Sequence, residues 1–147
     1  MTPDEVLLGT HRLFLDTSPI IYLVEDHATY AAAIQRVLEH AAELGIMLVT
    51  SPVTLAECLQ GALQASDSTI QEAFVSLIVH GPNTHFHVID ATTAIRAAEL
   101  RVKHGLRLPD ALQLASALAT GCEALLTNDM QFNRVDDLKI VMVSELA

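Results

Sequence analysis

Residues 12–19 read RLFLDTSP, and this stretch predicts how the chain begins its fold. Arg12–Leu15 is a short apolar run of the kind that forms a buried β-strand. Ser18 and Pro19 form a helix-start signal, because serine is a good N-cap and proline fits the first helical turn. Asp16 lies between the two, so the sequence places a carboxylate where a strand gives way to a helix.

The same alternation of strand and helix continues along the chain. Further strands are predicted at Ile46–Thr50, Phe86–Ile89, Ala124–Thr127 and Ile140–Val143. Helical spacing of apolar residues predicts helices at Tyr30–Leu44, Pro52–Gln64, Ser68–Val79, Thr92–His104 and Pro109–Thr120. Short strands that alternate with helices are typical of an α/β fold with a parallel sheet.

Composition favours a single globular domain over residues 1–147. The hydrophobic content is 51%, which argues against disorder, and the apolar runs are too short to span a membrane. No signal peptide is visible, so we expect a cytoplasmic protein whose two cysteines, Cys58 and Cys122, are reduced core residues. The net charge of -10 argues against a general nucleic-acid binder, although a nuclease with bound metal stays compatible with it.

Four stretches of the sequence are nearly empty of charge, and each contains one carboxylate. Among Asp, Glu, Lys and Arg, these lone residues are Asp16 in 13–24, Glu57 in 44–66, Asp110 in 108–122 and Asp129 in 124–133. An unpaired charge in apolar surroundings is costly to bury, so such a carboxylate needs a partner or a shifted pKa. Basic residues that could pair with all four are not beside them, which makes a shared divalent cation the simplest partner.

The predicted elements bring these acids towards one edge of the sheet. Asp16 and Asp129 follow the carboxyl ends of two strands, whereas Glu57 and Asp110 lie early in two helices. Ligands of open parallel sheets bind outside the carboxyl ends of strands, where the strand order reverses. Carboxylate oxygens without His or Cys favour a hard cation such as Mg²⁺ or Mn²⁺, which assists phosphodiester hydrolysis.

Each acid also has an ordinary structural explanation. Asp16 could cap a helix, Asp110 could complement a helix dipole, Asp129 could belong to a turn, and Glu57 could lie on an exposed helix face. These explanations weaken when the acids are taken together, because all of them map to the same edge of one sheet.

Four sequence blocks resemble the conserved blocks of PIN domains, most closely those of VapC-type toxin ribonucleases. The blocks are LDTS at 15–18, SPVTLAE at 51–57, LPDA at 108–111 and TNDMQF at 127–132. The resemblance implies a three-layer α/β/α sandwich with five parallel strands in the order 3-2-1-4-5. It also implies Mg²⁺- or Mn²⁺-dependent endoribonuclease activity, a homodimer, and a cognate antitoxin that blocks the site.

The resemblance also implies roles for individual residues. Asp16 and Asp110 would be the main metal ligands, and Asp129 would bind a second ion or orient the water of the first. Glu57 would be a ligand, a group that supports the ligands from behind, or the general base. The supporting hydrogen-bonding residues would be Thr17, Ser18 and Asn128. Residues 1–11 are longer than the segment that commonly precedes the first strand in this family, and their role stays open.

Half of the basic residues fall in one short segment. Arg96, Arg101, Lys103 and Arg107 either form a solvated helix face or a rim that contacts RNA phosphates beside the site. Asp90 also follows a predicted strand, but its position before a helix favours an N-cap role.

Alternative functions on a similar fold are less well supported. A receiver domain needs paired acids after the first strand and a lysine after the last, and Asp16 stands without either. A haloacid-dehalogenase-type phosphatase needs a second aspartate two positions after Asp16, where this chain has Ser18. A catalytically silent binding module on the PIN fold stays open, since sequence does not reveal turnover.

Overall fold

The computed structural model describes residues 1–146, so Ala147, the last residue of the predicted domain, lies outside the described residues. A parallel five-stranded sheet has the order β3-β2-β1-β4-β5. The strands are β1 (Arg12–Leu15), β2 (Met47–Thr50), β3 (Thr84–Phe86), β4 (Ala124–Thr127) and β5 (Lys139–Met142).

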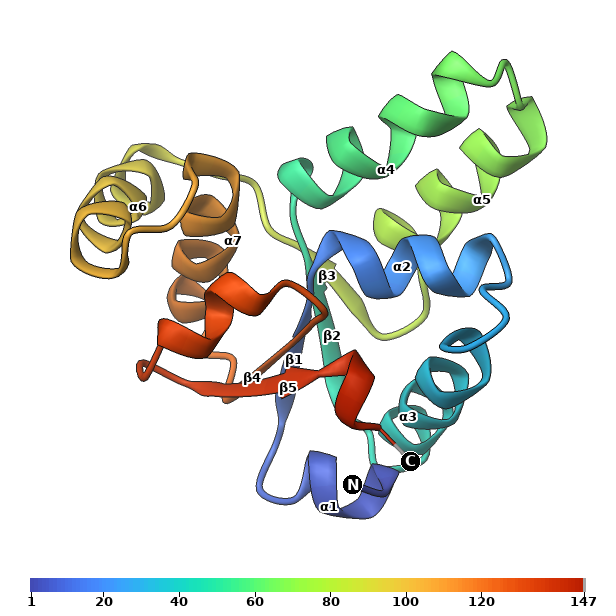
Figure 1. The fold of residues 1–147 in the computed structure, drawn as a ribbon, viewed down its shortest axis with the longest axis horizontal. Coiled ribbons are helices and arrows are strands. Elements are labelled where there is room, and N and C mark those ends of the chain that lie inside the picture. Colours follow the sequence, from blue (N-terminus) through green and yellow to red (C-terminus); the bar gives the residue numbers. More distant parts are fainter. Residues whose placement is uncertain (147) are drawn as a thin grey trace.

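Helices cover both faces of this sheet, as Figure 1 shows. They are α1 (Pro3–Leu7), α2 (Thr17–Val24), α3 (Ala31–Glu43), α4 (Pro52–Gln64), α5 (Ser68–Ile78), α6 (Ala91–His104) and α7 (Leu108–Ala119), with the short 3₁₀ helices η1 (Met130–Arg134) and η2 (Val143–Glu145). Helices α6 and α7 pack on one face, and the other long helices lie on the opposite side. The predicted α/β/α sandwich and its strand order are therefore confirmed.

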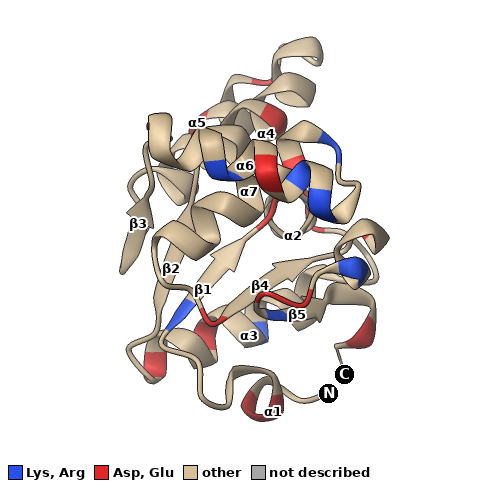
Figure 2. Cartoon of the chain, turned by 90° about the vertical axis from the view of Figure 1, so that its left-hand side faces the viewer, with Lys and Arg blue, Asp and Glu red and all other residues tan. Residues whose placement is uncertain are grey.

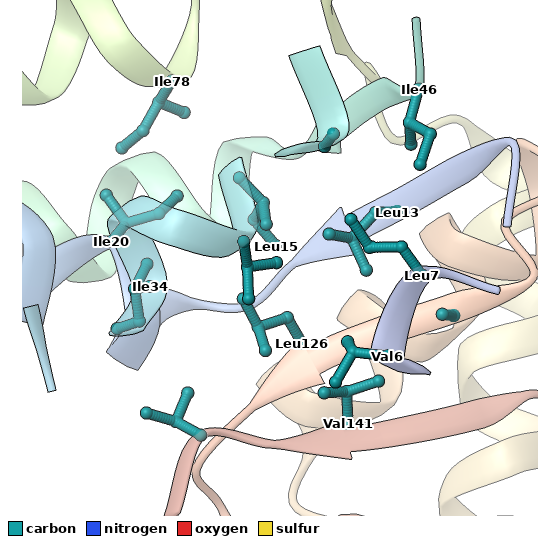
Figure 3. Close-up of a cluster of buried hydrophobic side chains, with 14 of the residues drawn as sticks. Val6, Leu7, Leu13, Leu15, Ile20, Ile34, Ile46, Ile78, Leu126 and Val141 are labelled. Carbon is teal, nitrogen blue, oxygen red and sulfur yellow. The ribbon is translucent and has the colours of Figure 1, made fainter. Parts of the chain in front are cut away.

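Strand β1 divides the core in two because neighbouring side chains of a strand point to opposite faces. Leu13 and Leu15 enter the cluster beneath α2 and α3, whereas Phe14 enters the cluster against α6 and α7. All three side chains are at most 2% exposed. Figure 3 shows Leu13 and Leu15 among the side chains of the first cluster. Burial on both faces explains why Leu13, Phe14 and Leu15 are all apolar, whereas Arg12 at the start of the strand is exposed.

Residues 1–11 add a helix to the base of the sheet. Thr2 caps α1, and its capping box with Glu5 satisfies backbone groups at the helix start. Val6 and Leu7 are buried in the same core cluster as Leu13, and Figure 3 places Leu7 beside Leu13 of β1 and Val6 beside Val141 of β5. This segment therefore extends the hydrophobic core.

The third strand lies earlier than predicted. The high β propensity of Phe86–Ile89 predicts a strand over those residues. In the structure, β3 spans Thr84–Phe86 and pairs with the end of β2. After a last hydrogen bond from His87 N–H to the Thr50 carbonyl (2.8 Å), the chain leaves the sheet and Val88 is exposed. Asp90 then caps α6 by accepting a hydrogen bond from Thr93 N–H, as predicted.

Cys58 and Cys122 are both buried and free, which confirms the prediction of reduced core cysteines. Across residues 1–146, no helix has the length and apolar character needed to cross a membrane.

Candidate active site

Asp16 lies at the carboxyl end of β1, in the middle of the sheet. Its backbone N–H donates to the Leu126 carbonyl of β4 (3.0 Å), so strand pairing continues up to this residue. The strand order reverses between β1 and β4, which is where open α/β sheets bind ligands. Asp16 occupies the N-cap position of α2, but its side chain makes no capping hydrogen bond. The carboxylate is therefore available for another role.

The Asp16 carboxylate is buried and held from two sides. Thr127 Oγ1 donates to Oδ2 (2.7 Å), and Gln113 Nε2 donates to Oδ1 (3.3 Å). Burial raises the pKa of Asp16 to about 6, although both hydrogen bonds favour the charged form. The nearby charge of Asp110 raises this pKa as well. A cation beside Asp16 would therefore relieve an electrostatic cost.

The raised pKa of Asp16 predicts a pH dependence of stability for the metal-free protein. An unfolded aspartate has a pKa near 3.9, so between about pH 4 and pH 6 the folded state keeps a proton that the unfolded chain releases. The stabilisation from this group is lost as pH rises through that window, by roughly 2–3 kcal/mol in total. Urea unfolding in EDTA should show this loss in the parent protein relative to Asp16→Asn. If the difference in the free energy of unfolding between the parent protein and Asp16→Asn did not change with pH, the raised pKa of Asp16 would be contradicted.

Asp110 lies in the first turn of α7 and is also buried. Burial raises its pKa, Arg107 opposes this shift, and the charges of Asp129 and Glu57 reinforce it. Together with the interaction between Asp110 and Asp16, these effects mean that all four predicted acids share one electrostatic environment. The structure thus brings together the four carboxylates that the sequence singled out.

Asp129 lies just past β4, and its side chain is 26% exposed. It accepts a hydrogen bond from Gln131 N–H (3.0 Å) and so caps η1. Asp129 therefore also has the structural role in a turn that the sequence allowed. The guanidinium of Arg107 connects this carboxylate to Asp110: Nε lies 3.0 Å from Asp110 Oδ2 and Nη2 lies 3.2 Å from Asp129 Oδ2.

Glu57 is half-buried in the second turn of α4. Thr17 Oγ1 donates to its Oε1 (2.7 Å), so the first turn of α2 orients this carboxylate. Ser18 Oγ accepts from the backbone N–H of Asn128 (3.1 Å), and Asn128 Oδ1 accepts from Ser144 N–H (3.1 Å). These contacts tie α2 to the segment after β4 and are compatible with the predicted supporting roles of Thr17, Ser18 and Asn128.

The donor set fits a hard divalent cation, because the four acids provide only oxygen ligands. The carboxylate oxygens of these four acids, however, do not lie close enough to one another to form a compact set of metal ligands. Within residues 1–146, the group whose potential ligand atoms all lie within 4.8 Å is His104, Asp136 and Asp137. That cluster lies at the end of α6, where Lys103 Nζ stands 3.6 Å from Asp137 and offsets its charge. In the four-acid site, an arginine and a glutamine side chain instead contact two of the carboxylates.

The predicted basic rim divides into two groups. Arg107 reaches the acids, whereas Arg96 and Lys103 line a separate cavity of about 400 Å³ beside α6. Arg101 is exposed on the same helix. Figure 2 shows the basic positions of α6, with an acidic position between them. Contact between these three α6 residues and RNA stays a prediction.

Sequence reasoning missed the amides that organise the acids. Gln113 is fully buried and contacts Asp16, and Gln131 Nε2 donates to Asp110 Oδ2 (3.0 Å) and to Asp129 Oδ2 (3.1 Å). A signal was present for Gln113, since it is the only amide in the apolar segment 109–120 and lies one turn after Asp110. Gln131 carries no comparable sequence signal.

Residues 13–138 match the family model of the PIN domain, a span that covers the acids and the sheet from β1 to the residue before β5. The chain belongs to the PIN domain family. A comparison with curated proteins gives no match.

Solved structures share the architecture of this PIN domain. A chain of VapBC2 from Rickettsia felis, bound to a promoter DNA fragment, has 19% identity and a TM-score of 0.72, covering 89% of this chain and 98% of that one. A toxin–antitoxin complex from Klebsiella pneumoniae has 22% identity and a TM-score of 0.67, with coverages of 89% and 97%. VapC20 from Mycobacterium tuberculosis, described as a sarcin-ricin loop cleaving toxin, has 18% identity and a TM-score of 0.65, with coverages of 77% and 86%. At these identities the likeness establishes a common fold.

Proposed function

We propose that this PIN domain protein is a metal-dependent endoribonuclease that hydrolyses RNA phosphodiester bonds. The observation that carries the proposal is buried Asp16, whose raised pKa and interaction with Asp110 favour a cation at the carboxyl edge of the sheet. A fold relative, VapC20, is described as a toxin that cleaves the sarcin-ricin loop, which supports RNA as the substrate class.

Asp16 and Asp110 would be the main ligands of Mg²⁺ or Mn²⁺, with Asp129 and Glu57 completing the site. Such an ion supplies a more acidic water and stabilises the negative charge that develops on a phosphate under attack. Gln113 and Thr127 orient Asp16 by donating to its two oxygens, each from a different side.

Glu57 is the best-placed general base among the four acids. Its Oε1 accepts a hydrogen bond from Thr17, which leaves Oε2 to take up a proton from the attacking water. Its side chain is half-buried and therefore stays in contact with solvent, the source of that water.

We further propose that the protein is the toxin of a type II toxin–antitoxin system, with a cognate antitoxin and a homodimeric state. Several solved structures with this fold are toxin–antitoxin complexes, from Rickettsia felis, Klebsiella pneumoniae and Salmonella typhimurium among others. The cytoplasm would be the site of action, because its RNA substrates are there. Co-purification of this protein with a small protein encoded beside it would support the proposed antitoxin. If this protein stays monomeric and unbound when that small protein is present, the proposal is contradicted.

Cleavage of RNA by the purified protein tests the proposed activity. We expect cleavage of total RNA in Mg²⁺ or Mn²⁺, complete loss in excess EDTA, and recovery when the metal is restored. Equal cleavage in EDTA would reject the metal requirement. Absence of cleavage with either metal, in a folded protein that still binds RNA or its partner, would identify a silent binding module instead.

A further inference from the structure

Arg107 supplies the acidic site with a positive charge from the protein itself. Its guanidinium contacts Oδ2 of both Asp110 and Asp129, at 3.0 and 3.2 Å. Gln131 Nε2 donates to the same two oxygens, at 3.0 and 3.1 Å. Oδ2 of Asp110 and Oδ2 of Asp129 are therefore already paired by side-chain donors.

The backbone and the guanidinium of Arg107 are held by different contacts. The backbone N–H of Arg107 donates to Gln131 Oε1 (3.1 Å), just before the start of α7. Its side chain is 66% exposed, so water competes for the guanidinium, whereas its partner Asp110 is 5% exposed and its partner Asp129 is 26% exposed. The guanidinium can therefore leave the two carboxylates while the backbone of Arg107 stays bound to Gln131.

We propose that Arg107 is an exchangeable counter-ion: a divalent metal displaces it from Asp110 and Asp129, and the released guanidinium then binds an RNA phosphate at the mouth of the site. This inference rests on the proposed function. A divalent ion carries twice the charge of a guanidinium and would bind the same two carboxylates, so the two cations compete for Asp110 and Asp129. The planar fork of arginine suits bidentate binding of phosphate.

A purely structural role for Arg107 makes a different prediction. If the guanidinium only held Asp110 and Asp129 in position, its removal would loosen the site and weaken metal binding. Under the exchange proposal, removal of the competitor strengthens metal binding and weakens RNA binding. The opposite signs of these two effects distinguish the roles.

Calorimetric titration of Mn²⁺ into the metal-free protein tests the first half of the proposal. We expect Arg107→Ala to bind Mn²⁺ about ten-fold more tightly than the parent protein, because the guanidinium no longer competes for Asp110 and Asp129. Arg107→Lys should lie between the two. Arg36→Ala removes the same charge from α3, on the other face of the sheet, and should leave the Mn²⁺ affinity within about two-fold, since distant surface charges are screened.

Fluorescence anisotropy with a labelled phosphorothioate RNA, whose backbone slows cleavage, tests the second half. With Mn²⁺ present, Arg107→Ala should lose about ten-fold in RNA affinity, whereas without Mn²⁺ the loss should be small because Arg107 is then bound to the acids. An equal loss in both conditions would overturn the release step.

The outcomes separate this inference from the proposed function. Wild-type protein that binds Mn²⁺ and cleaves RNA, combined with unchanged or weaker Mn²⁺ binding by Arg107→Ala, would reject the exchange role of Arg107 alone. Wild-type protein that binds no Mn²⁺ would reject the proposed function and the exchange role together.

Discussion

Replacing Asp16 with asparagine is expected to reduce metal-dependent RNA cleavage by more than about a hundred-fold. Substitution of a residue that only orients a metal ligand typically costs about 10- to 100-fold in activity, and substitution of the ligand itself should cost more. The substitution removes the central negative charge of the site. It also introduces an NH₂ group where two donors, Gln113 Nε2 and Thr127 Oγ1, now point at carboxylate oxygens. Both effects oppose binding of a cation.

The fold should survive this substitution. Burial makes the charge of Asp16 unfavourable in the metal-free protein, as its raised pKa indicates, so removal of the charge offsets the cost of placing an NH₂ group opposite a donor. Cleavage rates and Mn²⁺ titrations of the variant provide the measurement. Asp26→Asn is a matched control, since Asp26 is exposed beyond the end of α2 in a left-handed conformation that asparagine also adopts. Near-normal cleavage by Asp16→Asn would place the chemistry elsewhere.

Replacing Gln113 with alanine is expected to destabilise the protein by about 3 kcal/mol, from unpaired buried groups and a cavity. Gln113 is fully buried; its Oε1 accepts from Ser51 Oγ (2.5 Å), and its Nε2 donates to Thr54 Oγ1 (2.6 Å) and to Asp16 Oδ1. One side chain thus connects α7 with the start of α4 and the end of β1. Its loss should lower RNA cleavage as well, because Asp16 loses a donor.

Urea unfolding measures the effect of the Gln113 substitution. Gln113→Met keeps most of the volume and isolates the contribution of the hydrogen bonds, so it should cost about 2 kcal/mol. Gln35→Ala is the control, because Gln35 is exposed on α3 and its side chain donates a hydrogen bond to Glu39 on the same helix. Its expected effect is within about 0.5 kcal/mol. A cost below about 1 kcal/mol for Gln113→Ala would show that the network contributes little.

The convergence of the acids could be predicted from the sequence because it depends on topology alone. Asp16 and Asp129 each follow a buried strand, and parallel strands direct their carboxyl ends to one edge. The strand at Phe86–Ile89 was misplaced because β propensity there is high, yet the pairing partner β2 ends at Thr50 and the chain must leave the sheet. Local preference yields to register at the edge of a sheet.

The contacts that tune the acids could not be predicted in the same way. Gln113 and Thr127 lie 97 and 111 positions from Asp16, and only the packed fold brings them to its two oxygens. Two further contacts likewise join the start of α7 to the segment after β4: Arg107 with Asp129, and Gln131 with Asp110. The sequence does not reveal the path of that segment, so these contacts could not be predicted.

The central position of β1 has a consequence for synthesis on the ribosome. Strands β2 and β3 follow β1 within the first part of the chain, so one edge of β1 can pair early. The other edge must wait for β4, and both donors to Asp16 emerge from the same late segment. Pairing at such long sequence separation is slow and comes late in folding. The proposed nuclease site would therefore be completed only after Thr127 has been synthesised and β4 has paired with β1.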